Sequence, residues 1–359
     1  MRYDCFVSMD PKDYEKYSRQ ILFAPIGEAG QERLLASSAV VVGCGALGTA
    51  IASLLVRAGL GKLRIVDRDF VEPSNLQRQT LFEEADAREA LPKSIAAERR
   101  LRAINSGVAV EAIVADLTPK NVGELLGGFP LILDGTDNFE TRFLVNDAAV
   151  HFGVPWIYGA VVSSYGLTMT IRPGETACLA CLLELDGRRE AAGVEETCDT
   201  VGVLNSAVSV IAAIQAAEAL KLLTGNTPAL NGKLISFDVW SGQFQAIRVA
   251  RNAGCRACAR HEFSYLEGEA QPHITMCGRD SVQIHERSRK LDLAELRARL
   301  APTVPGVRHN DFLLRFVVPP SAGQPGACEI TVFADGRAII KGTRDPAVAR
   351  SLYARFLGA

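Results

Sequence analysis

Short apolar runs alternate with longer stretches of helical character through the first half of the chain. Ala39–Val42 is a β-branched run, the alanine- and leucine-rich segment after it ends at Gly59, and Leu63–Asp67 is a second apolar run closed by an acid. Similar runs at 108–114 and 129–134 continue the alternation. Strands that alternate with helices are typical of a mainly parallel sheet, so the sequence predicts an α/β domain with a Rossmann-like fold.

Two apolar strands between Val154 and Ile171 and a long apolar helix at Ala207–Leu223 follow. The remainder of the chain changes to short strands and isolated helices, with a turn signal at Asp335-Gly336. We therefore predict two domains, 1–265 with the parallel sheet and 266–359 with a small α+β fold. The elements expected in the second domain are strands at 282–285, 312–318, 329–333 and 338–341 and helices at 293–300 and 346–357.

Composition narrows the class of protein. The chain has 359 residues, more than one ordinary domain, and its 48% hydrophobic and 22% charged content is that of a globular protein. The formal net charge of −2 gives no electrostatic reason to expect nucleic acid or an anionic membrane as a partner. Gln215, Glu218 and Lys221 interrupt the longest apolar helix, and the N-terminus lacks a signal-peptide pattern, so we expect a cytoplasmic protein without a membrane span.

A glycine-rich turn joins the first apolar run to its helix. Gly43, Gly45 and Gly48 have GxGxxG spacing, and Asp67 closes the next strand. Glycines there let the backbone turn sharply and approach a phosphate, while the helix N-terminus offers free N–H groups and the acid can accept ribose hydroxyls. The pattern predicts a nucleotide without saying which one. A tight strand-to-helix turn without a ligand is the alternative.

A polar loop follows Asp67. Asn75, Arg78 and Gln79 are donors of the kind that hold a triphosphate, and the Arg78 guanidinium fits phosphate oxygens. Lys93 stands near the start of the next helix and could reach back toward the same phosphates. A solvated surface loop and a solvated helix face explain these residues equally well when each segment is considered alone.

An acid follows the strand at 129–134. Asp137 lies at the carboxyl end of a predicted parallel strand, where open α/β sheets bind their ligands. A magnesium ion bound to phosphates needs only one or two carboxylates, so Asp137 is a candidate Mg²⁺ ligand. Asp137 could also be the N-cap of the following helix, which does not exclude the metal role.

The nine cysteines, an odd number, argue against a disulfide framework. Cys178 and Cys181 form one CxxC pair and Cys255 and Cys258 another, which together predict a closed, structural tetrahedral zinc site. Redox-active pairs or a coincidence of spacing are the alternatives. Cys198 lies in a polar loop before the long helix and is a candidate nucleophile. The acids around it would raise its pKa, so an unreactive loop thiol remains the alternative.

Taken together, the motifs resemble those of the ThiF/MoeB/HesA family, the bacterial relatives of the ubiquitin-activating enzymes. The layout is most similar to that of a ThiF-type enzyme with a C-terminal α+β extension. The resemblance extends from Tyr14 to Cys258. The motifs that carry it are, in order, YSRQI, GxGxxG, the Asp67-x-Asp69 pair, SNLQRQ, a Pro-Lys helix start, DGTDN, CxxC, a Thr-Cys loop, the long apolar helix and the second CxxC.

The resemblance implies an enzyme that binds MgATP and adenylates the C-terminal Gly-Gly carboxylate of a small β-grasp sulfur carrier of the ThiS or MoaD type. Pyrophosphate would be released, and the carrier would then serve thiamine, molybdopterin or a related biosynthesis. A cysteine desulfurase or a rhodanese would be the sulfur donor. The sequence leaves the carrier, the donor and the pathway open.

The resemblance also implies roles for individual residues. Arg19 would enter the neighbouring subunit's site, which implies a homodimer, and Cys198 matches a loop cysteine that in some members forms a covalent link with the carrier. Asp137 would hold Mg²⁺. The residues expected to hold ATP are Gly43, Gly45, Gly48, Asp67, Asp69, Asn75, Arg78, Gln79, Lys93 and Asp137.

Two features depart from the family pattern. Family members often have a glycine shortly before the helix lysine, whereas this chain reads Glu89-Ala-Leu-Pro-Lys93. The tail has no rhodanese-type cysteine loop, so we expect it to dock the carrier, to stabilise a dimer or to be purely structural. An NAD-dependent oxidoreductase and a non-catalytic scaffold of the same fold are the competing interpretations, although the SNLQRQ and TDN motifs have no role in hydride transfer.

Overall fold

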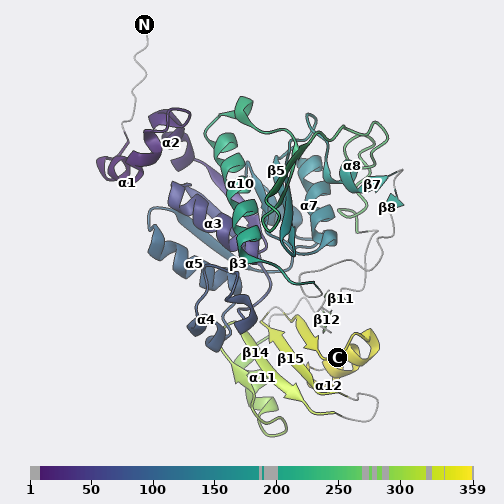
Figure 1. Cartoon of the computed structure of the whole chain (residues 1–359). Coiled ribbons are helices and arrows are strands. Elements are labelled where there is room, and N and C mark those ends of the chain that lie inside the picture. Colours follow the sequence, from purple (N-terminus) through teal and green to yellow (C-terminus); the bar gives the residue numbers. More distant parts are fainter. Residues whose placement is uncertain are drawn as a thin grey trace. The chain divides into compact units, whose positions relative to one another are not determined.

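The structure is a computed structural model that describes residues 9–185, 188–189, 201–268, 275–276, 281–284, 291–320, 326–334 and 336–357. The chain divides into two compact units (Figure 1). The first unit comprises Met1–Glu195 and Val203–Glu269, and the second consists mainly of Ala270–Ala359. We keep 1–265 and 266–359 as the proposed domain limits.

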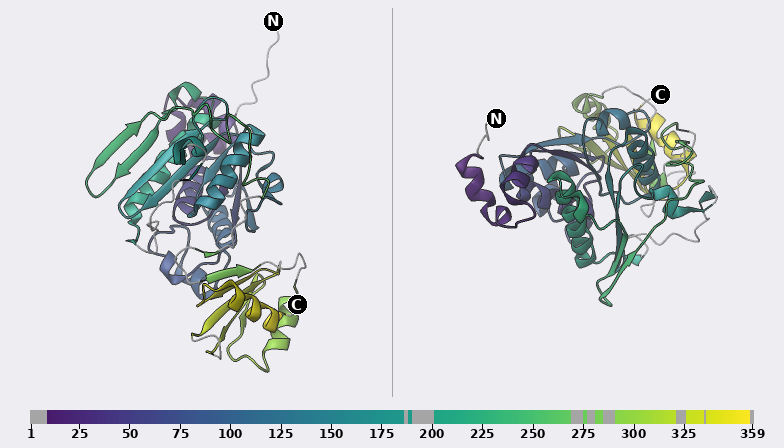
Figure 2. Two further views of the ribbon diagram at one scale, coloured as in Figure 1. Left: turned by 90° about the vertical axis from the view of Figure 1, so that its right-hand side faces the viewer. Right: turned by 90° about the horizontal axis from the view of Figure 1, so that it is seen from above.

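An eight-stranded sheet forms the centre of the first unit, with strand order β10-β9-β6-β5-β4-β1-β2-β3. The pairings from β3 to β5 are parallel, and those from β5 to β10 are antiparallel. The predicted α/β fold with a mainly parallel sheet is confirmed, with β9 and β10 extending from one edge (Figure 2). The strands are β1 (Ser38–Val42), β2 (Lys62–Asp67), β3 (Ala109–Val114), β4 (Ile132–Asp134), β5 (Trp156–Val162), β6 (Tyr165–Ile171), β9 (Leu234–Asp238) and β10 (Gln243–Ile247), with a separate pair β7 (Glu184–Leu185) and β8 (Arg188–Arg189).

A glycine ends the helix α3, and an asparagine begins the helix α7. α3 ends at Gly59, whose φ of 90° lies in the left-handed region that glycine adopts readily. The side chain of Asn138 accepts a hydrogen bond from the Thr141 N–H at 2.9 Å and caps α7, so the alternative that Asp137 is the N-cap is wrong. The helices of this unit are α1 (Pro11–Ile21), α2 (Gly27–Leu35), α3 (Ala46–Ala58), α4 (Glu84–Glu89), α5 (Lys93–Ile104), α6 (Val122–Leu126), α7 (Phe139–Phe152), α8 (Leu179–Leu183) and α10 (Asn205–Leu223), with 3₁₀ turns η1 (Pro73–Asn75) and η2 (Thr227–Ala229).

The helix α10 is a core element. Among the described residues it is the one helix with the length and apolar composition of a membrane span. It packs against α3, β5 and β6, and its polar side chains are partnered inside the unit. Gln215 Nε2 donates to the Asp134 carbonyl at 3.0 Å, and Glu218 Oε2 accepts from Thr170 Oγ1 at 2.9 Å. These contacts are those of a buried helix in a folded domain.

The second unit is a six-stranded antiparallel sheet with order β11-β12-β16-β15-β14-β13 and a core of its own. Both predicted helices and the strand at 338–341 have the expected limits. The strands predicted at 312–318 and 329–333 differ by one residue at their first end, and the one predicted at 282–285 is shifted by one residue at both ends. Pairing of Val332 with Ala338 confirms the predicted hairpin. The elements are β11 (Thr275–Met276), β12 (Ser281–Ile284), α11 (Leu293–Leu300), β13 (Arg308–His309), β14 (Leu313–Val318), β15 (Cys328–Phe333), β16 (Ala338–Lys341) and α12 (Pro346–Leu357).

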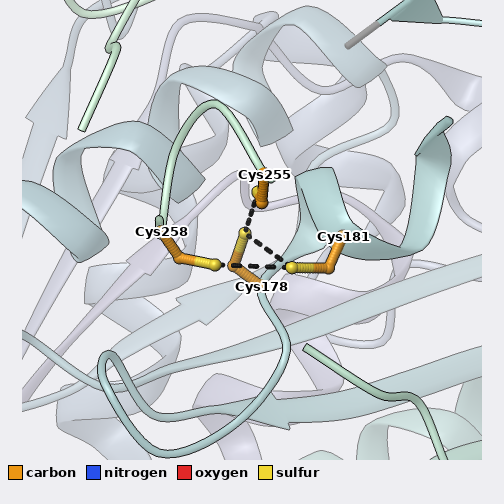
Figure 3. A group of neighbouring side chains, drawn as sticks. All are labelled: Cys178, Cys181, Cys255 and Cys258. Atoms are coloured by element: carbon orange, nitrogen blue, oxygen red, sulfur yellow. Dashed lines mark hydrogen bonds between the residues drawn. The ribbon is translucent and has the colours of Figure 1, made fainter. Parts of the chain in front are cut away.

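The two CxxC pairs converge on one point of the first unit (Figure 3). The Sγ atoms of Cys178 and Cys255 are 3.6 Å apart, those of Cys181 and Cys258 are 3.4 Å apart, and all four lie within 4.8 Å of one another. Zn–S bonds of about 2.3 Å in a tetrahedron place the sulfurs roughly 3.8 Å apart. The predicted cluster is therefore compatible with a structural zinc ion.

The helix α7 holds both halves of this cysteine cluster. The Asn146 side chain accepts from the Leu179 N–H at 2.8 Å, next to the first pair. Arg256, inside the second pair, donates from Nη1 to both carboxylate oxygens of Asp147 at 2.9 and 3.0 Å. Asp147 is fully buried, so this ion pair is shielded from solvent. The chain segment near residue 255 is thereby attached to the sheet through α7 as well as through the cluster.

We expect the purified chain to contain about one zinc ion, and the change Cys181→Ser to remove it and lower the thermal midpoint, because three thiolates leave the tetrahedral site incomplete. Metal analysis and thermal unfolding measure both effects. Cys328→Ser is the matched control, since Cys328 is a buried cysteine of the second unit's core. Zinc-free wild-type protein with an unchanged midpoint after chelation would contradict the assignment.

Candidate nucleotide-binding site

The glycine turn after β1 is built by close contacts between backbones. Gly43 has φ 87°, and a Cβ there would lie 2.6 Å from the Gly135 carbonyl oxygen. A Cβ at Gly48 would lie 1.9 Å from the Gly43 oxygen, so both positions require glycine for packing. At Gly45 the nearest atoms would be 3.8 and 4.0 Å away. Gly45 is therefore the member of the motif that faces space a ligand could approach.

Asp67 ties the end of β2 to this turn. Its Oδ2 accepts from the Cys44 N–H and its Oδ1 from the Asp69 N–H, both at 2.6 Å. Burial raises the pKa of Asp67 to about 6, with Lys93 lowering it and Asp69 raising it. Each carboxylate oxygen keeps a second lone pair, which is what acceptance of ribose hydroxyls requires.

Lys93 is unusually buried for a lysine, with 4% of its side chain exposed. Its Nζ lies 3.2 Å from Asp69 Oδ2, and its backbone N–H donates to the Asp69 carbonyl. Ala90, three residues before Lys93, has φ 49° and is the left-handed residue of the turn before α5.

The SNLQRQ segment supplies buried amides. Asn75 is 0% exposed and Gln79 3% exposed. Asn75 Oδ1 accepts from the Glu72 N–H at 3.0 Å, whereas Asn75 Nδ2 and Gln79 Oε1 have no hydrogen-bond partner among the described residues. Buried amide atoms without partners are costly, which fits a site completed by a polar ligand. Arg78 is half-buried, with Nη1 on the Ser74 carbonyl at 2.8 Å.

The two acids at the end of β4 and in the loop after it, Asp134 and Asp137, have different surroundings. Asp137 is exposed, while Asp134 is buried and paired with Arg142 at 3.2 Å. Sequence reasoning did not assign Arg142, nor the pair in which Arg68 Nη1 donates to both oxygens of Asp116 at 2.9 Å. These residues are separated in sequence by eight and 48 positions. Arg68, Asp116 and Asp134 lie at or just after predicted strand ends, whereas Arg142 gave no signal beyond its charge.

The predicted site residues come mostly from the carboxyl ends of β1, β2 and β4. These strands are neighbours, and the connections leave β1 toward β2 on one side and reach β4 on the other. Such a switch in strand order is where open α/β sheets bind nucleotides. Gln79 Nε2 near Gly45 and the Gly43–Gly135 contact link the turns directly. The structure therefore brings together the glycine turn, Asp67, Asp69, Lys93 and the SNLQRQ amides.

Two predicted residues stand apart from this group. Arg19 lies exposed on α1, and within the described part of the chain its side chain has no hydrogen bond or ion pair. Cys198 lies outside the described residues. The roles predicted for both remain predictions.

Comparison with known proteins gives the family. Residues 17–257 match the ThiF family. The sulfur carrier protein ThiS adenylyltransferase of Bacillus subtilis (strain 168) is 45% identical over 349 residues, covering 96% of this chain and 99% of that relative. The protein of the same name from Escherichia coli (strain K12) is 38% identical, covering 70% of this chain and 97% of its own length.

Solved structures agree in fold. Escherichia coli MccB with ATP has a TM-score of 0.59 at 23% identity, covering 69% of this chain and 76% of that one. The relatives are named adenylyltransferases, which favours the predicted enzyme class over the oxidoreductase alternative. The resemblance found in the motifs is thus confirmed, and this chain belongs to the ThiF family.

Proposed function

We propose that this enzyme adenylates the C-terminal carboxylate of a small β-grasp sulfur-carrier protein with ATP and releases pyrophosphate. The observation that carries the proposal is the group of buried polar residues at the glycine turn. Lys93 is held by Asp69, beside Asn75 and Gln79, each with an amide atom that has no partner in the described part of the chain. In a purely structural turn, burying these polar groups would cost free energy without any compensating interaction. The names of the relatives support the same chemistry.

In this reaction a carboxylate oxygen attacks the α-phosphorus in line, a new P–O bond forms, and the bond to the pyrophosphate oxygen breaks. The attacking group is already ionised, so no strong general base is needed. The protein must hold two anions close together and neutralise their charge. Lys93 and Arg78 would be the cations for that task, with Lys93 exchanging Asp69 for a phosphate oxygen.

Magnesium and the partner chain complete the proposal. Asp137 would hold the Mg²⁺ ion, which supplies positive charge to the phosphates when bound. Arg19 of a second copy would reach the phosphates, which makes the enzyme a homodimer. Cys198 would act after adenylation, when a cysteine desulfurase or rhodanese delivers sulfur.

A ThiS-type carrier, and hence thiamine biosynthesis, is favoured over molybdopterin by one observation. The Bacillus subtilis relative matches this chain over both of its units. We place the enzyme in the cytoplasm, where these carriers and ATP occur together.

We expect Asp137→Ala and Lys93→Ala to reduce ATP–pyrophosphate exchange by about 100-fold or more, because each removes charge stabilisation from the transition state. Exchange of labelled pyrophosphate into ATP, with a Gly-Gly-ended carrier present, measures this step alone. Cys198→Ala should keep full exchange while blocking sulfur transfer. Undiminished exchange in Asp137→Ala would place the metal elsewhere, and no exchange by the wild type with any such carrier would leave the scaffold interpretation.

The homodimer proposal predicts complementation. Arg19→Ala and Lys93→Ala should each be inactive alone, whereas mixing them under subunit exchange should restore about a quarter of wild-type activity, because half the dimers are mixed and each has one intact site. Differently tagged subunits verify that mixed dimers form. Mixed dimers without activity would mean that Arg19 does not act across the interface.

Adenosine affinity should depend on the ionisation of Asp67. With a pKa of about 6, this carboxyl is largely ionised at pH 7.5 and largely protonated at pH 5.5, so the dissociation constant should rise about fourfold on acidification. The pKa of Asp67 is higher in the folded protein than in the unfolded chain. Its contribution to the free energy of unfolding is therefore fully present below the pKa of the unfolded chain and is lost as the pH rises through about 6. Calorimetric titration with adenosine, which has no ionisable group in this range, tests it. A pH-independent Asp67→Asn variant is the control, and equal pH dependence in both proteins would refute the assignment.

A further inference from the structure

We propose that Arg142 is a positioning residue for adenylation, which sets the place of the loop Asp134–Asp137 against the glycine turn. The proposal rests on the proposed function, because the loop ends at the residue expected to hold Mg²⁺. Arg142 itself is 6% exposed, and its guanidinium is bonded to protein groups of the loop and of β5. Its effect on the reaction would therefore act through the loop.

The guanidinium of Arg142 joins three segments. Its Nε donates to Asp134 Oδ2 at 3.2 Å, and its Nη2 donates to the Thr136 carbonyl at 2.7 Å and to the Gly159 carbonyl at 3.2 Å. The first two contacts hold the two sides of the loop after β4, and the third attaches the loop to β5. A planar fork with several donors can make these contacts together, whereas a lysine ammonium on a flexible stem cannot reproduce them.

The loop is also held at Asp134 from other directions. Asp134 Oδ1 accepts from the Thr136 N–H at 2.9 Å and from its Oγ1 at 2.7 Å. Gln215 Nε2, from α10, donates to the Asp134 carbonyl at 3.0 Å and to the Ile157 carbonyl at 3.2 Å. The loop before Asp137 thus has hydrogen bonds to α7, to α10 and within itself, far more than a surface turn needs.

The held loop packs directly on the glycine turn. The Gly135 N–H donates to the Val42 carbonyl at 2.8 Å. A Cβ at Gly135 would lie 2.3 Å from the Gly43 oxygen and 2.8 Å from the Gly48 Cα. Gly135 and the glycine turn are already in close contact. If loss of Arg142 lets the loop move, both Asp137 and the glycine turn are therefore expected to shift.

The same helix offers a matched control. Asp147, five residues after Arg142 on α7, forms a second buried ion pair with Arg256, with side chains 0% and 8% exposed. That pair contacts the Glu262 carbonyl and the Tyr265 N–H, not the loop. Asp147→Asn therefore perturbs a buried charge on α7 without releasing Asp134–Asp137.

The test compares Arg142→Lys with Asp147→Asn in the full-length enzyme. For Arg142→Lys we expect the Mg²⁺ concentration at half-maximal ATP–pyrophosphate exchange to rise by about 10-fold to 100-fold, as for residues that orient a metal ligand. Asp147→Asn should leave that concentration unchanged even where it lowers the thermal midpoint. An unshifted Mg²⁺ dependence in Arg142→Lys, or equal shifts in both variants, would overturn the proposal.

A second variant and a direct binding measurement keep the result interpretable. If Arg142→Lys fails to fold, Arg142→Gln takes its place, because it removes the same contacts to Asp134, Thr136 and Gly159 without placing a second cation there. A raised Mg²⁺ requirement supports the proposal and an unchanged one refutes it. Mn²⁺ binding in the presence of ATP, followed by electron paramagnetic resonance, needs no turnover. Weaker Mn²⁺ binding in Arg142→Lys than in Asp147→Asn supports the positioning role even if the wild type adenylates no carrier, which would count against the proposed function alone.

Discussion

The contact between two glycine backbones, at Gly43 and Gly135, is the constraint on which the candidate nucleotide site depends. It joins the ends of β1 and β4 at a separation that no side chain could occupy. Because the strands on either side belong to one sheet, this contact places the glycine turn, Asp67 and the Asp134–Asp137 loop in one region. The site is therefore assembled by close backbone packing before any ligand contact is considered.

Charge in this region is balanced in pairs. Lys93 is held by Asp69, Arg68 by Asp116 and Arg142 by Asp134, each within 3.2 Å. Removing charges from water is costly unless they are paired, so the pairs allow buried cations to persist without ATP. Lys93 differs from Arg68 and Arg142 because its partner, Asp69, is itself one of the candidate site residues and is bonded to Asp67. In the proposed reaction, phosphate oxygens would replace Asp69 as the partner of Lys93 at little electrostatic cost.

Much of the fold could be predicted from the sequence because its signals are local. Apolar runs indicated the strands, and the glycine spacing indicated the first turn. The two CxxC pairs predicted a cysteine cluster whatever the course of the chain between them. The pair Asp134–Arg142 and its contact with Gly159 could not be predicted, since they depend on which strand lies beside β4. The N-cap of α7 was predicted wrongly for another reason. Asp137 and Asn138 are adjacent residues with similar capping preference, and only the backbone conformation of the folded chain shows that the helix begins after Asn138.

The two units have separate hydrophobic cores, one around Phe143 and Trp156 and the other around Phe316 and Tyr353. Cooperative unfolding is a property of a single core, so a protein built in this way need not melt in one transition. A single melting temperature would then average over two events. Calorimetric traces of this enzyme are best analysed as two overlapping heat-absorption peaks, of which only that of the ATP-binding unit should respond to nucleotide.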